Sequence, residues 1–242
     1  MSDLPIRKLQ ALFGDKLQEN VRMANYTTTR VGGPTLGMIS VYTADEMRRT
    51  VKTLWELDVP FRILGSGSNL LVSDSGYAGV MVHDRCHNVR IDTKGEQPVI
   101  FAEGGANLGA VSRQASLRGV SGFEWANSIP GTVGGAVYGN AGAHGTDVSK
   151  CLLQAQVITK AAGEQNLNSE EMGFKYRSSK FKRENEQVVI LSASFAGTKV
   201  EPEVTQRLLE ELTEKRRRTQ PVGPSFGSTF KNPKGDFAGR LL

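Results

Sequence analysis

The densest run of glycine in the chain lies between Ser128 and Gly145, in the segment SIPGTVGGAVYGNAGAHG. Glycine costs about 0.5–1 kcal/mol relative to alanine in regular structure, so this density is typical of backbone with positive φ or with a close neighbour. Two interpretations fit these residues. The segment is either a crowded loop packed on its own sheet, or a wall of backbone N–H groups that contacts a pyrophosphate or a flat ring.

A second turn of the same kind favours the ligand-binding interpretation, because a long dinucleotide needs two such turns. This turn is LGSGSNLLVSD, from Leu64 to Asp74, and it follows the apolar run FRIL. It has neither the lysine of a Walker loop nor the third glycine of a dinucleotide fingerprint. The preceding segment TADEMRRTVKTLWELDVP predicts a helix, with Thr43 near its start and Pro60 beyond its end. The turn therefore follows a short buried strand, at the end where α/β sheets bind ligands.

The remaining segments predict an α+β fold. LGAVSRQASLRG predicts a helix that ends at Gly119, and EPEVTQRLLEELTEKRRR predicts another that begins at Glu201 and is followed by Pro221. Short strand candidates fill residues 78–197 and indicate a mainly antiparallel sheet: GVMVHD, NVRIDTK, PVIFAEG, LQAQVITK and VVILSASF.

Charge and composition narrow the function classes. The net charge is +5, but the densest basic run, Lys215–Arg218, ends a predicted helix, where the helix dipole stabilises cations. That run is equally suited to binding an anionic small molecule, and nucleic-acid binding is not expected. No apolar run is long enough to cross a membrane, and the start MSDLPIRKLQ is too charged for a signal peptide, so a cytoplasmic location is expected. Cys86 and Cys151 are expected to be free thiols.

No metal site is predicted. His83, Cys86 and His87 have the spacing H-x-x-C-H, which lacks a fourth ligand and is better explained by a turn with incidental polar residues. His144, inside the glycine-rich segment, either faces solvent or lies near a cofactor.

The two glycine-rich blocks belong to a longer set of motifs. LGSGSNLLVSDSGYAGVMV and GFEWANSIPGTVGGAVYGNAGAHG resemble the flavin-binding signature of the UDP-N-acetylmuramate dehydrogenase family, also called UDP-N-acetylenolpyruvoylglucosamine reductase or MurB. TTTRVGG at 27–33, FKYRSSKFK at 174–182 and QPVGPSFGSTFKNPKGDFAGRLL at 220–242 resemble the family's other blocks in the same order. Together these motifs cover nearly the whole chain, and the short interval from Arg177 to Ser228 resembles the family's second subtype.

The resemblance implies a two-subdomain FAD-binding fold of the PCMH type, in residues 1–72 and 73–197, followed by a partial α/β substrate-binding domain in 198–242. The family has a catalytic glutamate well beyond its AG-x-L motif, whereas this chain stops at Leu242, so a truncated form is expected.

The implied activity is reduction of the enolpyruvyl group of UDP-N-acetylenolpyruvoylglucosamine to UDP-N-acetylmuramate, a peptidoglycan precursor. FAD is the implied cofactor, NADPH the reducing co-substrate, and a UDP-sugar the substrate. A monomer is expected. Two other hypotheses stay open: another flavoprotein of the same fold, such as an alcohol oxidase, or a non-catalytic FAD-binding module.

Residue roles follow from the same resemblance. Arg177 matches the arginine of the F-x-Y-R motif and would stabilise enolate-like charge, while Ser228 matches the family's proton donor. Taken singly, a surface salt bridge explains Arg177 and a turn explains Ser228; their joint place in matching motifs favours chemistry. Tyr176, Lys231 and Asn232 are the expected substrate contacts. The expected cofactor contacts are Arg30, Gly65, Ser66, Gly67, Ser68, Asn69, Leu70, Ser128, Ile129, Pro130, Gly131, Gly134, Gly135, Asn140, Ala141 and Gly142.

Overall fold

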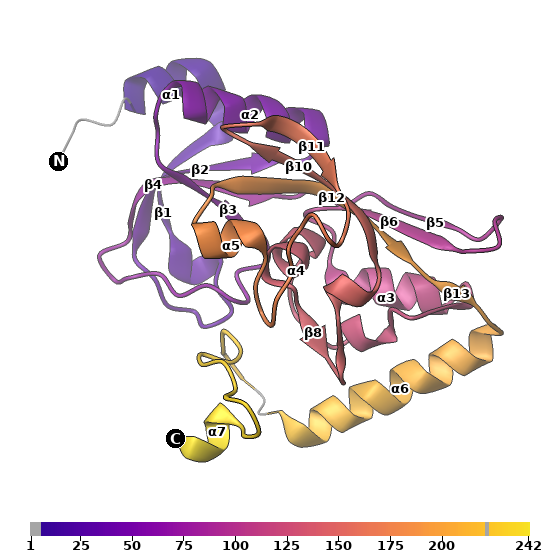
Figure 1. Ribbon diagram of the computed structural model, residues 1–242. Coiled ribbons are helices and arrows are strands. Elements are labelled where there is room, and N and C mark those ends of the chain that lie inside the picture. Colours follow the sequence, from indigo (N-terminus) through magenta and orange to yellow (C-terminus); the bar gives the residue numbers. More distant parts are fainter. Residues whose placement is uncertain (1–5, 221–222) are drawn as a thin grey trace.

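Two β-sheets lie side by side in the computed structural model, which describes residues 6–220 and 223–242 and so leaves Pro221 outside (Figure 1). The first sheet has the strand order β1-β2-β4-β3. Strands β2, β4 and β3 are parallel, and β1 is antiparallel to β2. The turn after β3 therefore lies at the carboxyl edge of the parallel strands, as predicted. The strands are β1 (Leu17–Arg22), β2 (Pro34–Val41), β3 (Phe61–Leu64) and β4 (Tyr77–Asp84).

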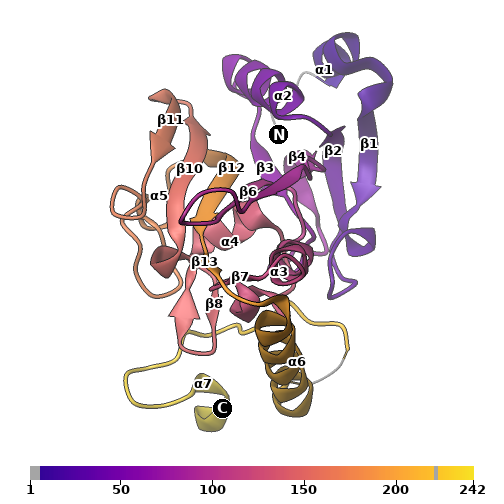
Figure 2. The ribbon, with the colours of Figure 1, turned by 90° about the vertical axis from the view of Figure 1, so that its right-hand side faces the viewer.

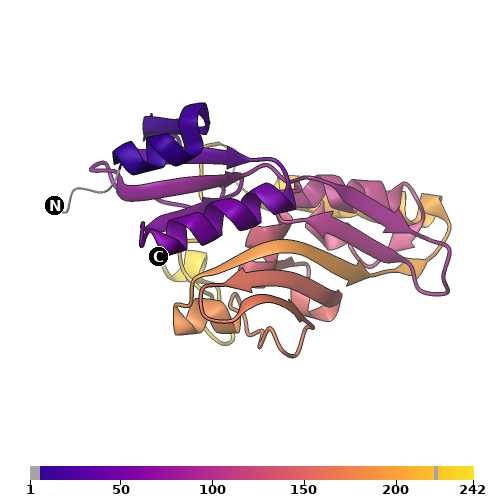
Figure 3. The same ribbon diagram turned by 90° about the horizontal axis from the view of Figure 1, so that it is seen from above.

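Helix α2 (Ala44–Glu56) packs against both sheets. Its N-cap is Thr43, which confirms the predicted helix start. The Thr43 hydroxyl accepts a hydrogen bond from the Glu46 N–H at 3.1 Å, which satisfies a backbone donor that the first turn leaves free. Seen from above, α2 runs along the junction between the sheets (Figure 3). Its apolar residues pack on strands of both sheets, and Trp55 Nε1 donates to Gln187 Oε1 at 2.7 Å. Helix α1 (Ile6–Phe13) packs beside it through Leu9.

The second sheet is antiparallel throughout, in the order β11-β10-β12-β6-β5. Its central strand β12 is buried on both faces: Val189 and Leu191 pack toward α2, whereas Ile190 and Ala193 pack toward α3 and α4. This double burial explains the apolar run VVIL at the start of β12. The strands are β5 (Val89–Asp92), β6 (Val99–Glu103), β10 (Leu152–Thr159), β11 (Gly163–Leu167) and β12 (Val188–Ala196), and the helices α3 (Leu108–Ser116) and α4 (Val133–Gly139).

Strand β4 belongs to the first sheet, although the sequence groups it with the antiparallel strands. It lies between β2 and β3 and is parallel to both. The expected boundary at residues 72 and 73 therefore falls inside the span of the first sheet, which ends at Asp84. Strand patterns do not identify the partner strand, but the apolar run Val80–Val82 is typical of a strand buried on both faces in a parallel sheet.

Helix α6 (Pro202–Thr219) lies along the outside of the second subdomain, beside α3 (Figure 2). Thr205 is its one buried residue and donates from Oγ1 to the Ser116 carbonyl at 2.8 Å. Within residues 6–220 and 223–242, no helix is both long enough and apolar enough to cross a membrane. The shorter elements are η1 (Gly14–Lys16), η2 (Met23–Asn25), β7 (Val120–Ser121), η3 (Glu124–Ala126), β8 (Gly142–Ala143), β9 (Thr146–Asp147), η4 (Val148–Lys150), α5 (Lys180–Glu184), β13 (Thr198–Lys199) and α7 (Ala238–Leu241).

Asp84 ends β4 with a buried carboxyl group, which is 6% exposed. Its Oδ1 accepts a hydrogen bond from the Cys86 N–H at 3.0 Å, and the backbone at Gly104 and Gly105 lies close by. Burial raises the pKa of Asp84 to about 6, although the hydrogen bond from Cys86 opposes this shift. The folded protein therefore holds the Asp84 proton more tightly than the unfolded chain does.

We expect Asp84→Asn to remove a pH dependence of stability. The stability that the protonated carboxyl group provides is complete below about pH 4 and is lost as the pH rises through about 6. Relative to Asp84→Asn, the free energy of unfolding of the wild type should fall by about 2–3 kcal/mol across this interval, measured by urea unfolding. Asp92 is an exposed control that accepts a similar bond from the Lys94 N–H. Parallel pH profiles for wild type and Asp84→Asn would contradict the expectation.

Candidate functional site

The two glycine-rich segments meet in space. Ser68 Oγ, in the turn after β3, donates to the Pro130 carbonyl at 3.1 Å. A Cβ atom on Gly65 would lie 2.6 Å from Thr132 Oγ1, so only glycine allows this approach. The predicted pair of turns therefore forms one continuous surface between the two subdomains.

The segment before Arg30 completes this surface from a third direction. The Thr28 N–H donates to the Gly67 carbonyl at 3.2 Å, and a Cβ atom on Gly67 would lie 1.9 Å from the Tyr26 carbonyl oxygen. Gly67 has φ +65°, and Arg30 has φ +59° with an exposed side chain. Thr28 Oγ1 also donates to the Ser225 carbonyl, which brings the C-terminal segment beneath the loops of the first sheet (Figure 1).

The two segments differ in their free hydrogen-bond donors. Among the hydrogen bonds of the described residues, none uses a backbone N–H from Ser66 to Leu70. By contrast, the Val133 N–H donates to the Ala106 carbonyl at 2.9 Å, and the Gly134 N–H to the Gly104 carbonyl at 2.7 Å. Successive free N–H groups bind anions. The turn after β3 is therefore the part of the surface suited to a diphosphate.

The glycine-rich segment between Ser128 and Gly145 is partly helical, which the sequence interpretation as a loop or wall missed. Helix α4 begins after Thr132, whose Oγ1 accepts a hydrogen bond from the Gly135 N–H at 3.4 Å. Val133, Ala136 and Val137 share the buried face against the second sheet. Their i, i+3, i+4 spacing after a threonine was the available signal, and the number of glycines obscured it.

Two hydroxyl groups at this surface are buried without a partner. Ser128 Oγ and Thr29 Oγ1 make no hydrogen bond within the described residues. A buried hydroxyl group left unsatisfied costs about 1–3 kcal/mol, so such groups normally bind water or a ligand. Ser128 is a predicted cofactor contact, whereas Thr29 lies beside the predicted Arg30 and was missed.

Arg177 lies in a tight turn that contacts the end of the glycine-rich segment. Lys175 and Ser178 exchange two backbone hydrogen bonds, of 2.9 and 3.0 Å, around this turn. Arg177 Nη2 donates to the Gly142 carbonyl at 2.5 Å, and the guanidinium lies 5.5 Å from the centre of the Tyr176 ring. The predicted catalytic arginine and two of the predicted contacts, Tyr176 and Gly142, are therefore together.

Cationic side chains gather around this turn. Partial burial lowers the pKa of Lys182, although the residue is exposed as a whole, and the positive charges of Lys231 and Arg177 lower this pKa further. The pKa of His144 is also lowered, first by burial and then by the charges of Lys215 and Arg216. The C-terminal segment and the end of α6 thus add positive charge to the side of the surface that carries Arg177, which suits an anionic ligand.

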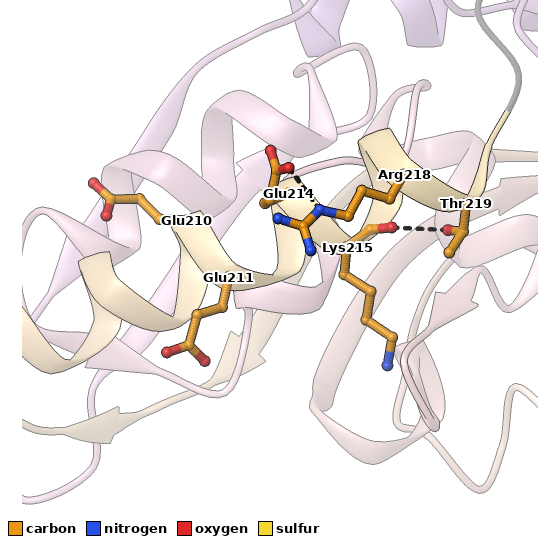
Figure 4. A pocket seen from close by; sticks show the side chains of 6 residues that line it. All are labelled: Glu210, Glu211, Glu214, Lys215, Arg218 and Thr219. Carbon is orange, nitrogen blue, oxygen red and sulfur yellow. Dashed lines mark hydrogen bonds and ion pairs between the residues drawn. The ribbon is translucent and has the colours of Figure 1, made fainter.

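The remaining part of the basic run is paired along α6. Arg217 Nε and Arg218 Nε lie 3.0 and 2.8 Å from the Glu214 carboxylate oxygens. A hollow along this helix contains no predicted site residue (Figure 4). Within the basic run, Arg217 and Arg218 are therefore explained by the helix itself, whereas Lys215 and Arg216 add positive charge near His144 and suit an anionic ligand. The hollow is lined by Glu210, Glu211, Glu214, Lys215, Arg218 and Thr219.

The other predicted residues differ in their surroundings. Ser228 and Lys231 are exposed, and no hydrogen bond within the described residues joins Ser228 to Arg177. Asn232 Oδ1 accepts a hydrogen bond from the Ala238 N–H at 3.0 Å. Asn140 turns its side chain inward, toward Lys175 and Ser149. Ser66 and Asn69 are exposed on the turn, Leu70 packs under it, and Ile129 and Ala141 pack on the core of the second subdomain.

The metal-like grouping is dispersed. Cys86 is buried in the core beneath α2, whereas His87 is exposed and contacts the Arg85 carbonyl through Nδ1. The His83 ring packs edge-on against Tyr26, with 5.6 Å between ring centres. These three side chains do not share a site.

Comparison with known proteins first defines the class. Residues 35–166 match a family model described as FAD binding domain. The fold also resembles that of cholesterol oxidase from B. sterolicum, with a TM-score of 0.57 at 15% identity, over 76% of this chain and 37% of that one. Together with the surface described above, these matches define a flavoprotein with a PCMH-type FAD-binding fold.

Closer relatives identify the family. The chain is 37% identical over 228 residues to UDP-N-acetylenolpyruvoylglucosamine reductase from Clostridium botulinum (strain Alaska E43 / Type E3), covering 94% of this chain and 73% of that relative. The crystal structure of this reductase (MurB) from Thermus caldophilus matches with a TM-score of 0.77 at 32% identity, over 91% of this chain and 77% of that one. The chain therefore belongs to the UDP-N-acetylenolpyruvoylglucosamine reductase family.

We expect Gly67→Ala to weaken FAD binding at least tenfold, as measured by quenching of flavin fluorescence. The new Cβ would collide with the Tyr26 carbonyl and displace the turn that carries the free N–H groups. Gly163→Ala is the matched control, because Gly163 has φ +67° but no atom within 4 Å of the position that a Cβ would take. Both variants bear the cost of about 1–2 kcal/mol for a left-handed residue, but only Gly67→Ala adds the collision. Equal FAD affinities for the two variants would contradict this assignment.

Proposed function

We propose that the protein is an NADPH-dependent flavoenzyme that reduces the enolpyruvyl group of UDP-N-acetylenolpyruvoylglucosamine to UDP-N-acetylmuramate, in peptidoglycan precursor synthesis. One observation carries the proposal: in a chain of this family, the segment from Ser128 to Gly142 contacts both the turn after β3, which carries the free N–H groups, and the turn that bears Arg177. A cofactor held on the first side would thus adjoin a cationic site on the second.

The residues present fit FAD. Backbone N–H groups from Ser66 to Leu70 would bind its diphosphate, because they have no acceptor among the described residues. The buried hydroxyls of Ser128 and Thr29 would gain partners from the bound cofactor or its water. When bound, FAD supplies a two-electron carrier between NADPH and the substrate.

Arg177 would stabilise the charge that develops during reduction. Addition of a hydride to the enolpyruvyl double bond leaves negative charge conjugated with the neighbouring carboxylate, and a planar guanidinium suits this pair of oxygens. The bond to the Gly142 carbonyl and the contact with Tyr176 restrict the side chain beforehand, so less entropy is lost on substrate binding. Lys231 and Asn232 complete the proposed substrate contacts, with Tyr176.

Ser228 would protonate the neighbouring carbon. Its place in the motif GSTF supports this role. The Ser228 hydroxyl is also exposed and has no protein partner within the described residues. A hydroxyl group is a weak acid, but a carbanionic carbon is basic enough to accept its proton. The cationic residues near Arg177 would favour this transfer by stabilising the resulting alkoxide.

The proposal includes the organisation of the chain. Two FAD-binding subdomains are followed by residues of a substrate-binding domain from position 198, and the two sheets favour a first boundary between Asp84 and Val89. A monomeric state and a cytoplasmic location also belong to the proposal.

Anaerobic assays of FAD-loaded protein test the function. We expect NADPH consumption to depend on UDP-N-acetylenolpyruvoylglucosamine and to yield a product heavier by two hydrogens, detected by mass spectrometry. A colourless protein after reconstitution would exclude the cofactor. If the enolpyruvyl substrate fails to reoxidise the flavin under these conditions but oxygen, admitted afterwards, does so rapidly, an oxidase would instead be supported.

We expect Ser228→Ala to separate the two half-reactions in stopped-flow experiments. Reduction of the bound flavin by NADPH should keep its wild-type rate, whereas reoxidation by the enolpyruvyl substrate should slow by about 10²-fold or more. The neighbouring hydroxyl variant Thr229→Ala is the control and should leave both rates unchanged. Equal slowing of both half-reactions by Ser228→Ala would argue against proton donation.

A further inference from the structure

Arg177 has a backbone conformation that its own side chain does not favour. Its φ is +54°, in the left-handed region where residues other than glycine are destabilised by about 1–2 kcal/mol. Asparagine and glycine are the usual residues at such positions of a turn. An arginine persists there only when the surrounding structure holds it. The groups that hold this turn therefore determine where the guanidinium lies.

Asn140 is one of these groups and is almost fully buried, with 2% exposure. Its Nδ2 donates to the Lys175 carbonyl at 3.1 Å, which is the oxygen that also closes the turn by accepting from the Ser178 N–H. Its Oδ1 accepts a hydrogen bond from the Ser149 N–H at 3.0 Å. One side chain thus fixes the end of α4, the residues of η4 and the Arg177 turn relative to one another.

Two neighbouring bonds support the same turn. Ser179 Oγ donates to the Tyr138 carbonyl at 2.7 Å, and Lys182 Nζ donates to the Arg177 carbonyl at 3.3 Å. The first joins the turn to α4, as Asn140 does. The second lies on the solvent side, where Lys182 is exposed. Asn140 differs from Lys182 because its side chain is buried, and from Ser179 because it bonds to the carbonyl that closes the turn.

Asn140 itself has φ +47° and is the C-cap of α4. Asparagine tolerates this left-handed conformation well, and its short amide can reach nearby backbone groups. The sequence assigns Asn140 to cofactor binding, but its amide oxygen and nitrogen both engage the protein. Its effect on chemistry would therefore be exerted through Arg177.

We propose that Asn140 is a positioning residue, which holds the Lys175–Ser178 turn in the strained conformation that directs Arg177 toward the substrate. The catalytic part of this inference rests on the proposed function. The conformational part concerns the turn alone and can be measured without substrate.

Asn140→Asp is the variant that tests the inference. Aspartate has nearly the same shape, tolerates positive φ and keeps an oxygen acceptor for the Ser149 N–H, but it replaces the donor to the Lys175 carbonyl with a carboxylate oxygen. We expect hydrogen exchange at the Lys175 and Ser178 amides to accelerate at least tenfold in FAD-loaded protein. FAD affinity should change by less than about twofold. Unchanged exchange at these two amides would overturn the proposal.

Half-reaction kinetics supply the functional measurement. Asn140→Asp should leave flavin reduction by NADPH unchanged and slow reoxidation by the enolpyruvyl substrate by about 10- to 100-fold, since small displacements of a catalytic group have effects of this size. In an Arg177→Ala background, the same substitution should have no further effect. If the two effects multiply instead, Asn140 acts independently of Arg177 and the proposal is wrong.

Asn185→Asp is the matched control. Asn185 is also a left-handed helix C-cap, with φ +53°, but its side chain is exposed. We expect Asn185→Asp to alter neither hydrogen exchange at the Lys175 and Ser178 amides nor reoxidation of the flavin by the substrate. This comparison separates loss of the Asn140 amide bond from the general effect of aspartate at a left-handed cap.

A second variant, Asn140→Gly, tests the proposal if Asn140→Asp does not fold. Asn140→Gly keeps the left-handed backbone and removes both side-chain bonds without adding charge, so it should show the same acceleration of exchange. If both variants lose FAD and the cooperative unfolding transition, Asn140 has a general structural role and the proposal is overturned. A wild-type protein that exchanges as expected but never reduces the substrate would instead contradict the proposed function, leaving the turn's support by Asn140 intact.

Discussion

The close approach of Gly67 to the backbone near Tyr26 is the constraint on which the site depends. Any side chain on Gly67 would overlap the Tyr26 carbonyl, while the Gly67 carbonyl accepts the Thr28 N–H. The turn after β3 is therefore fixed through its carbonyl side, and the N–H groups from Ser66 to Leu70 have no protein acceptor among the described residues. Donors left free in a fixed turn are pre-organised for an anion, because little reorganisation is needed when the anion binds.

The second subdomain contacts this turn, and most of the hydrogen bonds that hold the contacting segment are made by backbone atoms. Ser68 bonds to Pro130, and the start of α4 is held to the backbone at Gly104 and Ala106. The end of α4 then contacts the Arg177 turn through Asn140 and Gly142. The proposed cofactor surface and the proposed cationic surface for the substrate thus lie at the two ends of one short helix. A displacement of that helix would affect both sites together.

Local patterns in the sequence predicted much of the fold. Helices α2, α3 and α6 and strands β3, β5, β6, β10 and β12 lie where capping residues and apolar spacing placed them. The sheet membership of β4 was not predictable in this way, since it depends on pairing with β2, which is distant in sequence. Helix α4 was missed because four glycines in the segment from Gly131 to Gly139 indicated irregular backbone more strongly than the buried spacing of Val133, Ala136 and Val137 indicated a helix.

In the site, too, local features could be predicted from the sequence, whereas contacts between distant segments could not. The glycine and serine content identified both turns, and the structure brings them into contact at Ser68 and Pro130. Which turn has free N–H groups depends on acceptors elsewhere in the chain, such as the Gly104 carbonyl, and composition carries no information about them. The inward direction of the Asn140 side chain likewise depends on Lys175 and Ser149. The roles of Arg177 and Ser228 remain proposals, because they rest on motif resemblance and on the surroundings of each residue.

The affinity of the protein for FAD, FMN and riboflavin, measured by quenching of flavin fluorescence, tests the central claim most directly. These ligands share the ring system; FMN adds one phosphate to riboflavin, and FAD adds a diphosphate and an adenosine. If the free N–H groups after β3 bind the diphosphate, FAD should bind at least about 100-fold more tightly than riboflavin, with FMN between them, in accord with about 1.5–3 kcal/mol for each hydrogen bond to a charged group. Equal affinities for the three flavins would contradict the claim.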